Sequence, residues 1–290
     1  MRFSGSYVAL VTPFHADGSV NFEKLRELVE WHVQQGTDGI VALGTTGESS
    51  TMSHEEDDAV ARAVIETVNG RIPVICGAGS NSTQTQLEKS RRYHDMGADG
   101  LLLITPYYNK ANDEGMYRHF AAVADAVDTP IILYNVPGRT GCSISPACCA
   151  RLAAHPNIAG IKEASGNIGY TAQIAKLVSG DFCMFSGNDD MIVPIMSLGG
   201  CGVISVWANI CPKEVHTLTS AFASGDIAKA REIQLKYLEL IGALFCEVNP
   251  IPVKEAMNQM GMEVGGYRLP LCEISHEGRE RVRRALEVLR

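Results

Sequence analysis

The sequence predicts an α/β fold, a (β/α)₈ TIM barrel with a C-terminal helical extension. Eight short runs rich in Val, Ile and Leu recur along the chain, and amphipathic stretches separate them. Short apolar runs are typical of buried parallel strands, and their alternation with helices is typical of a closed barrel. The predicted strands are residues 7–11, 39–43, 73–77, 100–104, 131–134, 158–162, 182–186 and 202–206.

An internal similarity supports a repeating unit. Residues 36–43 read Gly-Thr-Asp-Gly-Ile-Val-Ala-Leu and resemble residues 97–104, Gly-Ala-Asp-Gly-Leu-Leu-Leu-Ile. In both, a glycine that ends a helix leads into a strand. The alternative, an open doubly wound sheet, would need a Gly-x-Gly-x-x-Gly turn after the first strand, and the sequence has none there.

Helices are expected between the strands and beyond them. Amphipathic segments at residues 22–35, 54–68 and 83–96 are the first. About eighty residues follow the eighth strand, more than one closing helix needs, and helical patterns continue there. We therefore predict a catalytic barrel over residues 1–224 and a helical region over residues 225–290 that packs on it. The helices expected after the last strand are residues 212–223, 226–245, 252–260 and 276–289.

Composition disfavours several classes of protein. The formal net charge is -8 and the pI about 5.5, whereas nucleic acid and anionic membranes bind basic patches. No apolar run approaches the roughly 18 residues of a membrane span, and the N-terminus lacks a signal-peptide layout, so we expect a cytoplasmic protein. The nine cysteines are scattered without a Cys-x-x-Cys pair, which predicts reduced thiols in the core.

Lys162 closes the sixth predicted strand. Active sites of this fold lie at the carboxyl ends of the strands, so the position is of interest. A lysine there either extends its ammonium to solvent or stays partly desolvated. A desolvated lysine gives up its proton more readily, and a neutral amine attacks a carbonyl carbon. Lys162 is therefore the candidate nucleophile, with a solvent-seeking lysine as the alternative.

Other strand ends carry further candidates. Glycines flank Thr45 and Thr46, whose hydroxyls and backbone N–H groups suit a small carboxylate. Paired tyrosines follow the fourth strand and are typical of interface packing. Tyr134 ends the fifth strand, and Arg139 in the following Pro-Gly loop suits a second carboxylate. An acidic pair, residues 189–190, follows the seventh strand without metal-ligand spacing, so we expect it to cap a helix.

Three of these segments together resemble a known family. They are residues 44–48 (Gly-Thr-Thr-Gly-Glu), 134–141 (Tyr-Asn-Val-Pro-Gly-Arg-Thr-Gly) and 161–166 (Ile-Lys-Glu-Ala-Ser-Gly). In order and spacing they resemble the signature segments of the pyruvate-dependent class I aldolase and lyase family. Arg139 and residues 249–254, Asn-Pro-Ile-Pro-Val-Lys, favour the synthases that condense pyruvate with L-aspartate 4-semialdehyde for lysine and diaminopimelate biosynthesis.

Two alternatives differ from that activity. Sialic acid and sugar-acid aldolases belong to the same family, but the position of Arg139 is occupied differently in them. A non-catalytic barrel that senses an oxoacid is less expected, because a sensor need not keep a proton relay.

The resemblance implies a role for each matching residue. Lys162 forms a Schiff base with pyruvate, and no metal or organic cofactor is needed. Arg139 binds the carboxylate of the semialdehyde. Tyr134, Thr45 and Tyr108 form a proton relay. Thr45 and Thr46 bind the pyruvate carboxylate. Gly187 and Ile204 line the pocket.

The resemblance also implies assembly and regulation. A homotetramer, built as a dimer of dimers, would supply Tyr108 to a neighbouring subunit. Many family members bind L-lysine, and this chain keeps five matching positions. Thr85 stands in place of a glutamate, which removes an anionic partner for the lysine ammonium, and Asp57 in place of a frequent histidine. We therefore expect weak or absent lysine inhibition. The matching positions are Ser49, Ser50, His54, Asn81 and Tyr107.

Overall fold

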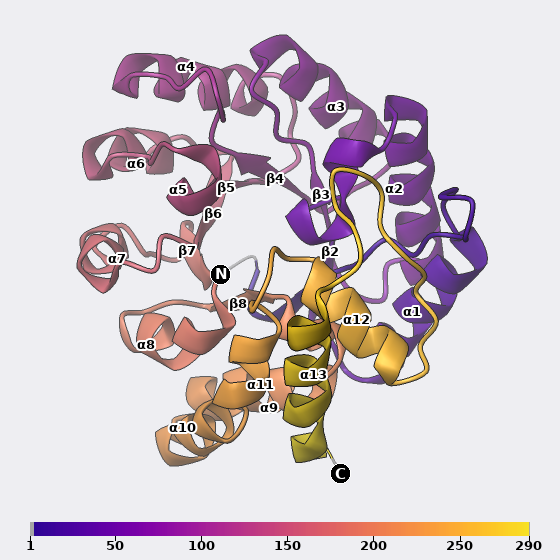
Figure 1. The fold of residues 1–290 in the computed structure, drawn as a ribbon. Helices are drawn as coiled ribbons and strands as arrows, with labels where there is room; N and C mark the ends of the chain where they lie inside the picture. Colours follow the sequence, from indigo (N-terminus) through magenta and orange to yellow (C-terminus); the bar gives the residue numbers. More distant parts are fainter. Residues whose placement is uncertain (1–2, 290) are drawn as a thin grey trace. The chain divides into compact units, whose positions relative to one another are not determined.

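The computed structural model describes residues 3–289 (Figure 1). Within them eight strands follow one another in a closed barrel, in the order β1 to β8. The predicted (β/α)₈ fold is therefore confirmed, and every predicted strand lies within two residues of an observed one. The strands are β1 (Gly5–Ala9), β2 (Gly39–Ala42), β3 (Val74–Gly77), β4 (Gly100–Ile104), β5 (Ile131–Asn135), β6 (Ile158–Glu163), β7 (Cys183–Ser186) and β8 (Gly202–Ser205).

The chain forms two compact units, each described by itself. Unit A comprises residues 3–5 with Pro73–Ile204, and unit B comprises Ser6–Ile72 with residues 205–289. The helices of residues 225–289 thus belong to the same unit as β2 and most of β1. The expected domain boundary after residue 224 stays a prediction.

Unit A contains β3 and most of the strands that follow, paired in parallel. Its strands are buried almost throughout, as their apolar sequences require. The unit's longer helices lie outside the strands, and each packs against the next along the chain (Figure 1). They are α3 (Thr83–Asp95), α4 (Asp113–Ala124), α6 (Pro146–Ala153), α7 (Ile168–Ala175) and α8 (Ile192–Ser197); a short α5 (Pro137–Thr140) follows β5.

Unit B combines an early segment of the chain, Ser6–Ile72, with the late segment of residues 205–289. In β1 and β2, Tyr7 pairs with Gly39, where a side chain would collide with the tyrosine ring. Asn209 connects the far part of the chain to β1, because its amide donates to the Ala9 carbonyl at 2.8 Å and accepts from the Val11 N–H at 3.1 Å. The helices are α1 (Phe22–Gln34), α2 (His54–Val68), α9 (Pro212–Ala223), α10 (Ile227–Lys236), α11 (Leu238–Ala243), α12 (Ile251–Gln259) and α13 (His276–Ala285).

One predicted helix is wrong as drawn from the sequence. Residues 226–245 were expected to form a single helix, whereas the chain leaves helical geometry at Tyr237, where φ is -98° and ψ is 5°. Tyr237 is buried with its ring centroid 5.1 Å from that of Trp207. Packing of this aromatic side chain, and not a glycine or proline, accompanies the break.

The cysteines agree in part with expectation. All nine are free thiols, and six are buried. Cys272 is exposed, so the expectation of core thiols is wrong there. Among residues 3–289, no cluster of His, Cys, Asp or Glu could hold a metal ion, and no helix is long and apolar enough to cross a membrane.

Candidate active site

Lys162 and Tyr134 lie side by side at the ends of β6 and β5. They are Cα partners across the two strands, and the ammonium nitrogen is 4.3 Å from the centroid of the tyrosine ring. Lys162 is 6% exposed and Tyr134 is 7% exposed. Lys162 forms no salt bridge within the described residues, so its amine is buried against an aromatic face rather than a carboxylate. The alternative of a solvent-seeking lysine is wrong.

Gly187 leaves room for the lysine stem. A Cβ atom at this position would lie 3.1 Å from Lys162 Cε and 2.6 Å from Ala164 Cβ. Any larger residue would therefore push the lysine or the following turn out of place. Ile204, the other predicted lining residue, is fully buried in β8.

Behind the lysine is a polar pair that sequence reasoning did not assign. Glu163 is 1% exposed and accepts hydrogen bonds from Asn135 Nδ2 at 2.8 Å and from the Ser165 N–H at 2.7 Å. Burial raises the pKa of the Glu163 carboxyl above its ordinary value. Asn135 and Glu163 follow Tyr134 and Lys162 directly in two signature segments, and that adjacency was the available signal.

The loops after β4 and β5 carry the other predicted residues of unit A. Arg139 is exposed on α5, which ends at Gly141 with a φ of 70°. Tyr108 is 91% exposed and has a φ of 70°, which is uncommon for a tyrosine. Asn81 Nδ2 donates to the Tyr107 carbonyl at 3.2 Å, so two of the five predicted lysine-site residues are brought together.

In unit B, the Gly-Thr-Thr-Gly segment forms a 3₁₀ turn, Thr45–Gly47. Leu43 before it and Glu48 after it both have positive φ, 59° and 55°, which other contacts must hold in place. Asn249 Nδ2 donates to Thr46 Oγ1 at 3.0 Å. The segment that sequence reasoning used only for the resemblance thus holds a predicted carboxylate-binding threonine.

A buried ion pair holds the same turn. Lys254 Nζ is 2.8 Å from Glu48 Oε1, and both side chains are fully buried. Lys254 also donates to the carbonyls of Thr12, at 3.1 Å, and Gly266, and its ammonium is 4.4 Å from the Phe14 ring centroid. Burial lowers the pKa of Lys254 from its ordinary value, and the nearby carboxylate opposes that shift.

A second pair fixes the segment that follows. Arg268 binds Glu56 through two hydrogen bonds, of 2.8 and 2.6 Å, and donates to the Thr51 carbonyl at 3.0 Å. The Arg268 guanidinium holds the pKa of Glu56 at about 2. Ser49 and Ser50 lie in the 3₁₀ turn Ser49–Thr51, and His54 begins α2.

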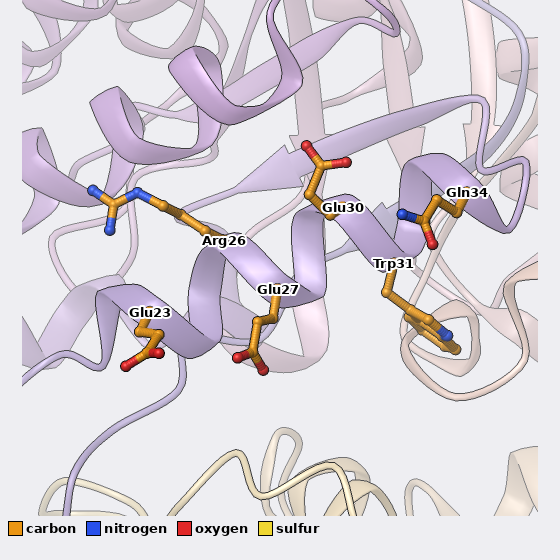
Figure 2. A pocket seen from close by; sticks show the side chains of 6 residues that line it. All are labelled: Glu23, Arg26, Glu27, Glu30, Trp31 and Gln34. Atoms are coloured by element: carbon orange, nitrogen blue, oxygen red, sulfur yellow. The ribbon is translucent and has the colours of Figure 1, made fainter.

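The hollow on the outer face of α1 is not the site. It has a volume of about 570 Å³ and is lined by α1 side chains alone (Figure 2). None of the predicted site residues lines it, and three of its six lining residues are glutamates, which repel carboxylate substrates. The lining residues are Glu23, Arg26, Glu27, Glu30, Trp31 and Gln34.

Comparisons with known proteins place the whole chain beside named relatives and solved structures. A 4-hydroxy-tetrahydrodipicolinate synthase from Thermoanaerobacter sp. (strain X514) is 53% identical over 285 residues, which cover 98% of this chain and 96% of the relative. The structure of dihydrodipicolinate synthase from Acinetobacter baumannii complexed with pyruvate is 46% identical, with a TM-score of 0.96 and 98% of each chain covered. A dihydrodipicolinate synthase variant characterised as monomeric is 40% identical, with a TM-score of 0.96, 99% of this chain covered and 97% of the other.

The model of the dihydrodipicolinate synthetase family matches residues 2–289. This match covers all three segments that carried the resemblance. The resemblance is confirmed, and the chain belongs to the dihydrodipicolinate synthetase family.

Proposed function

We propose that this chain condenses pyruvate with L-aspartate 4-semialdehyde to give 4-hydroxy-tetrahydrodipicolinate. The observation that carries the proposal is Lys162, a buried amine at a strand end that lies against Tyr134 and pairs with no carboxylate of residues 3–289. Membership of a family whose relatives bear the synthase name supports the same activity. The enzyme is a lyase of the class I aldolase type, needs no cofactor, and works in the cytoplasm.

The lysine supplies the electron sink. Its neutral amine adds to the ketone carbon of pyruvate, and the carbonyl oxygen takes one proton from the amine and one from the relay and leaves as water, which gives an iminium. The positive nitrogen makes the methyl group acidic, so a proton leaves and an enamine forms. The enamine carbon bonds to the aldehyde carbon of the second substrate, whose oxygen takes up a proton. The substrate's own amine then displaces Lys162 and closes the ring.

The remaining residues bind substrates and move protons. Tyr134, Thr45 and Tyr108 form the proton relay, which needs groups within hydrogen-bond reach of one another. Thr45 and Thr46 hold the pyruvate carboxylate. The bond from Asn249 supports this role, because it occupies a lone pair of the Thr46 hydroxyl and leaves the hydroxyl proton free to donate. Arg139 binds the semialdehyde carboxylate.

Arg139→Ala tests substrate choice. We expect kcat/KM for the semialdehyde to fall by roughly 30-fold or more, because a charge-assisted contact is worth on the order of 2–4 kcal/mol. Reductive trapping of pyruvate on Lys162 should change little. The control is Arg118→Ala, since Arg118 is an exposed arginine of α4. Steady-state assays compare the semialdehyde with sugar aldehydes, and faster turnover of a sugar aldehyde by the unaltered enzyme would favour an aldolase instead.

The chain assembles as a homotetramer in which Tyr108 completes the relay of a neighbouring subunit. Its 91% exposure, beside Tyr107 at 39%, supports a role outside its own barrel. A monomeric variant is known among the family's solved structures, so assembly has to be measured on this chain.

L-lysine should inhibit weakly or not at all. The missing glutamate at Thr85 lowers affinity by about ten- to a hundredfold, the worth of one charged hydrogen bond. Asp57, the other departure, is buried in α2. A lysine titration at saturating substrates checks this, and Thr85→Glu should begin to restore inhibition. Inhibition of the unaltered enzyme below millimolar lysine would contradict the expectation.

A further inference from the structure

Two pairs of neighbouring residues occupy opposite faces of the same two strands. Tyr134 pairs with Lys162 across β5 and β6, and Asn135 pairs with Glu163 one step further on. Successive side chains of a strand point to opposite faces, so the second pair lies directly behind the first. Helix α6 packs against β6, and Tyr170 of α7 donates to the Ile144 carbonyl at 2.7 Å.

The direction of the hydrogen bond between Asn135 and Glu163 is fixed by their other partners. Asn135 Oδ1 accepts from the Ile144 N–H at 3.1 Å, so its Nδ2 must face Glu163. Glu163 Oε1 accepts from the Ser165 N–H at 2.7 Å, which leaves Oε2 to accept from Asn135 at 2.8 Å. Within residues 3–289 no lysine, arginine or histidine pairs with Glu163. All four polar side-chain atoms of Asn135 and Glu163 thus have a hydrogen-bond partner, although both residues are buried.

The same two residues also fix the turns above them through their main chains. The Ala164 N–H donates to the Asn135 carbonyl at 2.9 Å, and the Gly187 N–H donates to the Glu163 carbonyl at 2.7 Å. Any shift of Asn135 relative to Glu163 would move Tyr134 relative to Lys162, because each is joined to its neighbour by one peptide unit.

We propose that Asn135 and Glu163 are positioning residues, which hold the Lys162 amine at the right place against Tyr134 without touching the substrate. The inference rests on the proposed function, because it assigns these residues to the Schiff-base chemistry of Lys162. Proton transfer between the two groups needs hydrogen-bond distances, and a displacement of about 1 Å at such a site costs roughly 100-fold in rate.

Exchanging the two functional groups tests the pair. Glu163→Gln places an amide N–H₂ against that of Asn135, because Ser165 keeps the oxygen of the new glutamine. Asn135→Asp places two carboxylates face to face. The double variant Asn135→Asp/Glu163→Gln restores one donor and one acceptor with the direction reversed, and keeps one negative charge. We expect each single variant to lose roughly 100-fold in kcat, and the double variant to return to within about fivefold of the unaltered enzyme.

Asn157→Ser is the matched control. Asn157 precedes the opposite end of β6, where its amide donates to the carbonyls of Ala124 at 3.4 Å, Val127 at 2.6 Å and Thr129 at 3.1 Å. Its loss should lower the melting temperature and leave kcat within about twofold, because it lies away from the strand end that carries Lys162.

The readouts are kcat, KM for pyruvate, the pH profile of kcat, the melting temperature, and the rate at which borohydride reduces the pyruvate iminium on Lys162. The single variants should slow trapping and shift the pH profile, and the double variant should reverse both changes. A merely structural role would lower the melting temperature without moving either readout.

The outcomes separate the inference from the proposed function. If the unaltered enzyme is not labelled at Lys162, the proposed function is overturned and the inference with it. If it is labelled, and Glu163→Gln traps pyruvate as fast as Asn157→Ser does, only the inference is overturned. Should a single variant not fold, the double variant is compared with Asn157→Ser; a folded double variant with kcat still reduced about 100-fold would also overturn the inference.

Discussion

Replacing Lys162 with alanine should remove nearly all turnover, with kcat/KM falling by roughly 10⁴-fold or more. The variant keeps the barrel but has no amine to form the iminium, so pyruvate stays a ketone and its methyl group is not acidified. Lys162 is surrounded by the ends of β5 and β6, and shortening its side chain should change the melting temperature little. Steady-state kinetics and mass spectrometry after borohydride treatment measure the loss.

The control for this variant is Lys176→Ala, since Lys176 is an exposed lysine that follows α7. It should retain activity and labelling. Labelling of Lys110 or Lys254 with Lys162 unmodified would contradict the assignment of the nucleophile.

Lys162→Ala subunits also test assembly. Tyr108→Phe should also lose turnover, and a mixture with Lys162→Ala subunits should recover part of it if the relay crosses a subunit boundary. A mixture that stays inactive after verified subunit exchange would mean that each barrel carries its own relay.

Replacing Lys254 with methionine should cause the largest loss of stability. The substitution leaves the Glu48 carboxylate buried without its cation, and breaking a buried pair in this way costs about 3–5 kcal/mol. For a chain of this size the melting temperature should fall by about 10 °C. Thermal unfolding measures the change, and KM for pyruvate should rise because the turn that carries Thr45 and Thr46 loses its anchor.

Two further variants show whether the loss of stability in Lys254→Met comes from the unpaired Glu48 carboxylate. Glu48→Gln/Lys254→Met removes both charges and should regain part of the lost stability, because no unpaired ion stays buried. Lys229→Met removes one partner of the exposed pair with Glu232 and should change stability by less than about 1 kcal/mol. A double variant no more stable than Lys254→Met would mean that Lys254 acts through its carbonyl contacts and not through Glu48.

The eight strands could be predicted from local sequence, and so could the position of the lysine that we propose as the nucleophile. Each strand is a short apolar run between turn residues, and burial on both faces requires that composition. Lys162 stood out because it closes such a run. The buried ion pair of Glu48 and Lys254 could not be predicted, because a single sequence does not show that two residues 206 positions apart are in contact.

Adjacent residues can be as hard to interpret. Asn135 and Glu163 lie inside recognised segments, yet the pattern alone does not say which face of the strand each occupies or what it contacts. The break at Tyr237 has the same cause. Nothing in residues 226–245 departs from a helical pattern at that point, and only the tertiary environment of the ring accounts for it.

The long separation of Glu48 from Lys254 also bears on how the protein is made. A ribosome releases Glu48 206 residues before Lys254, and Thr46 likewise precedes its partner Asn249 by 203 residues. A nascent chain in which Lys162 has already left the ribosome still lacks Lys254, the cation that neutralises Glu48. The turn Thr45–Gly47 is therefore locked only after residue 254 has been made, and a product that terminates between residues 162 and 254 carries the proposed nucleophile without the locked turn.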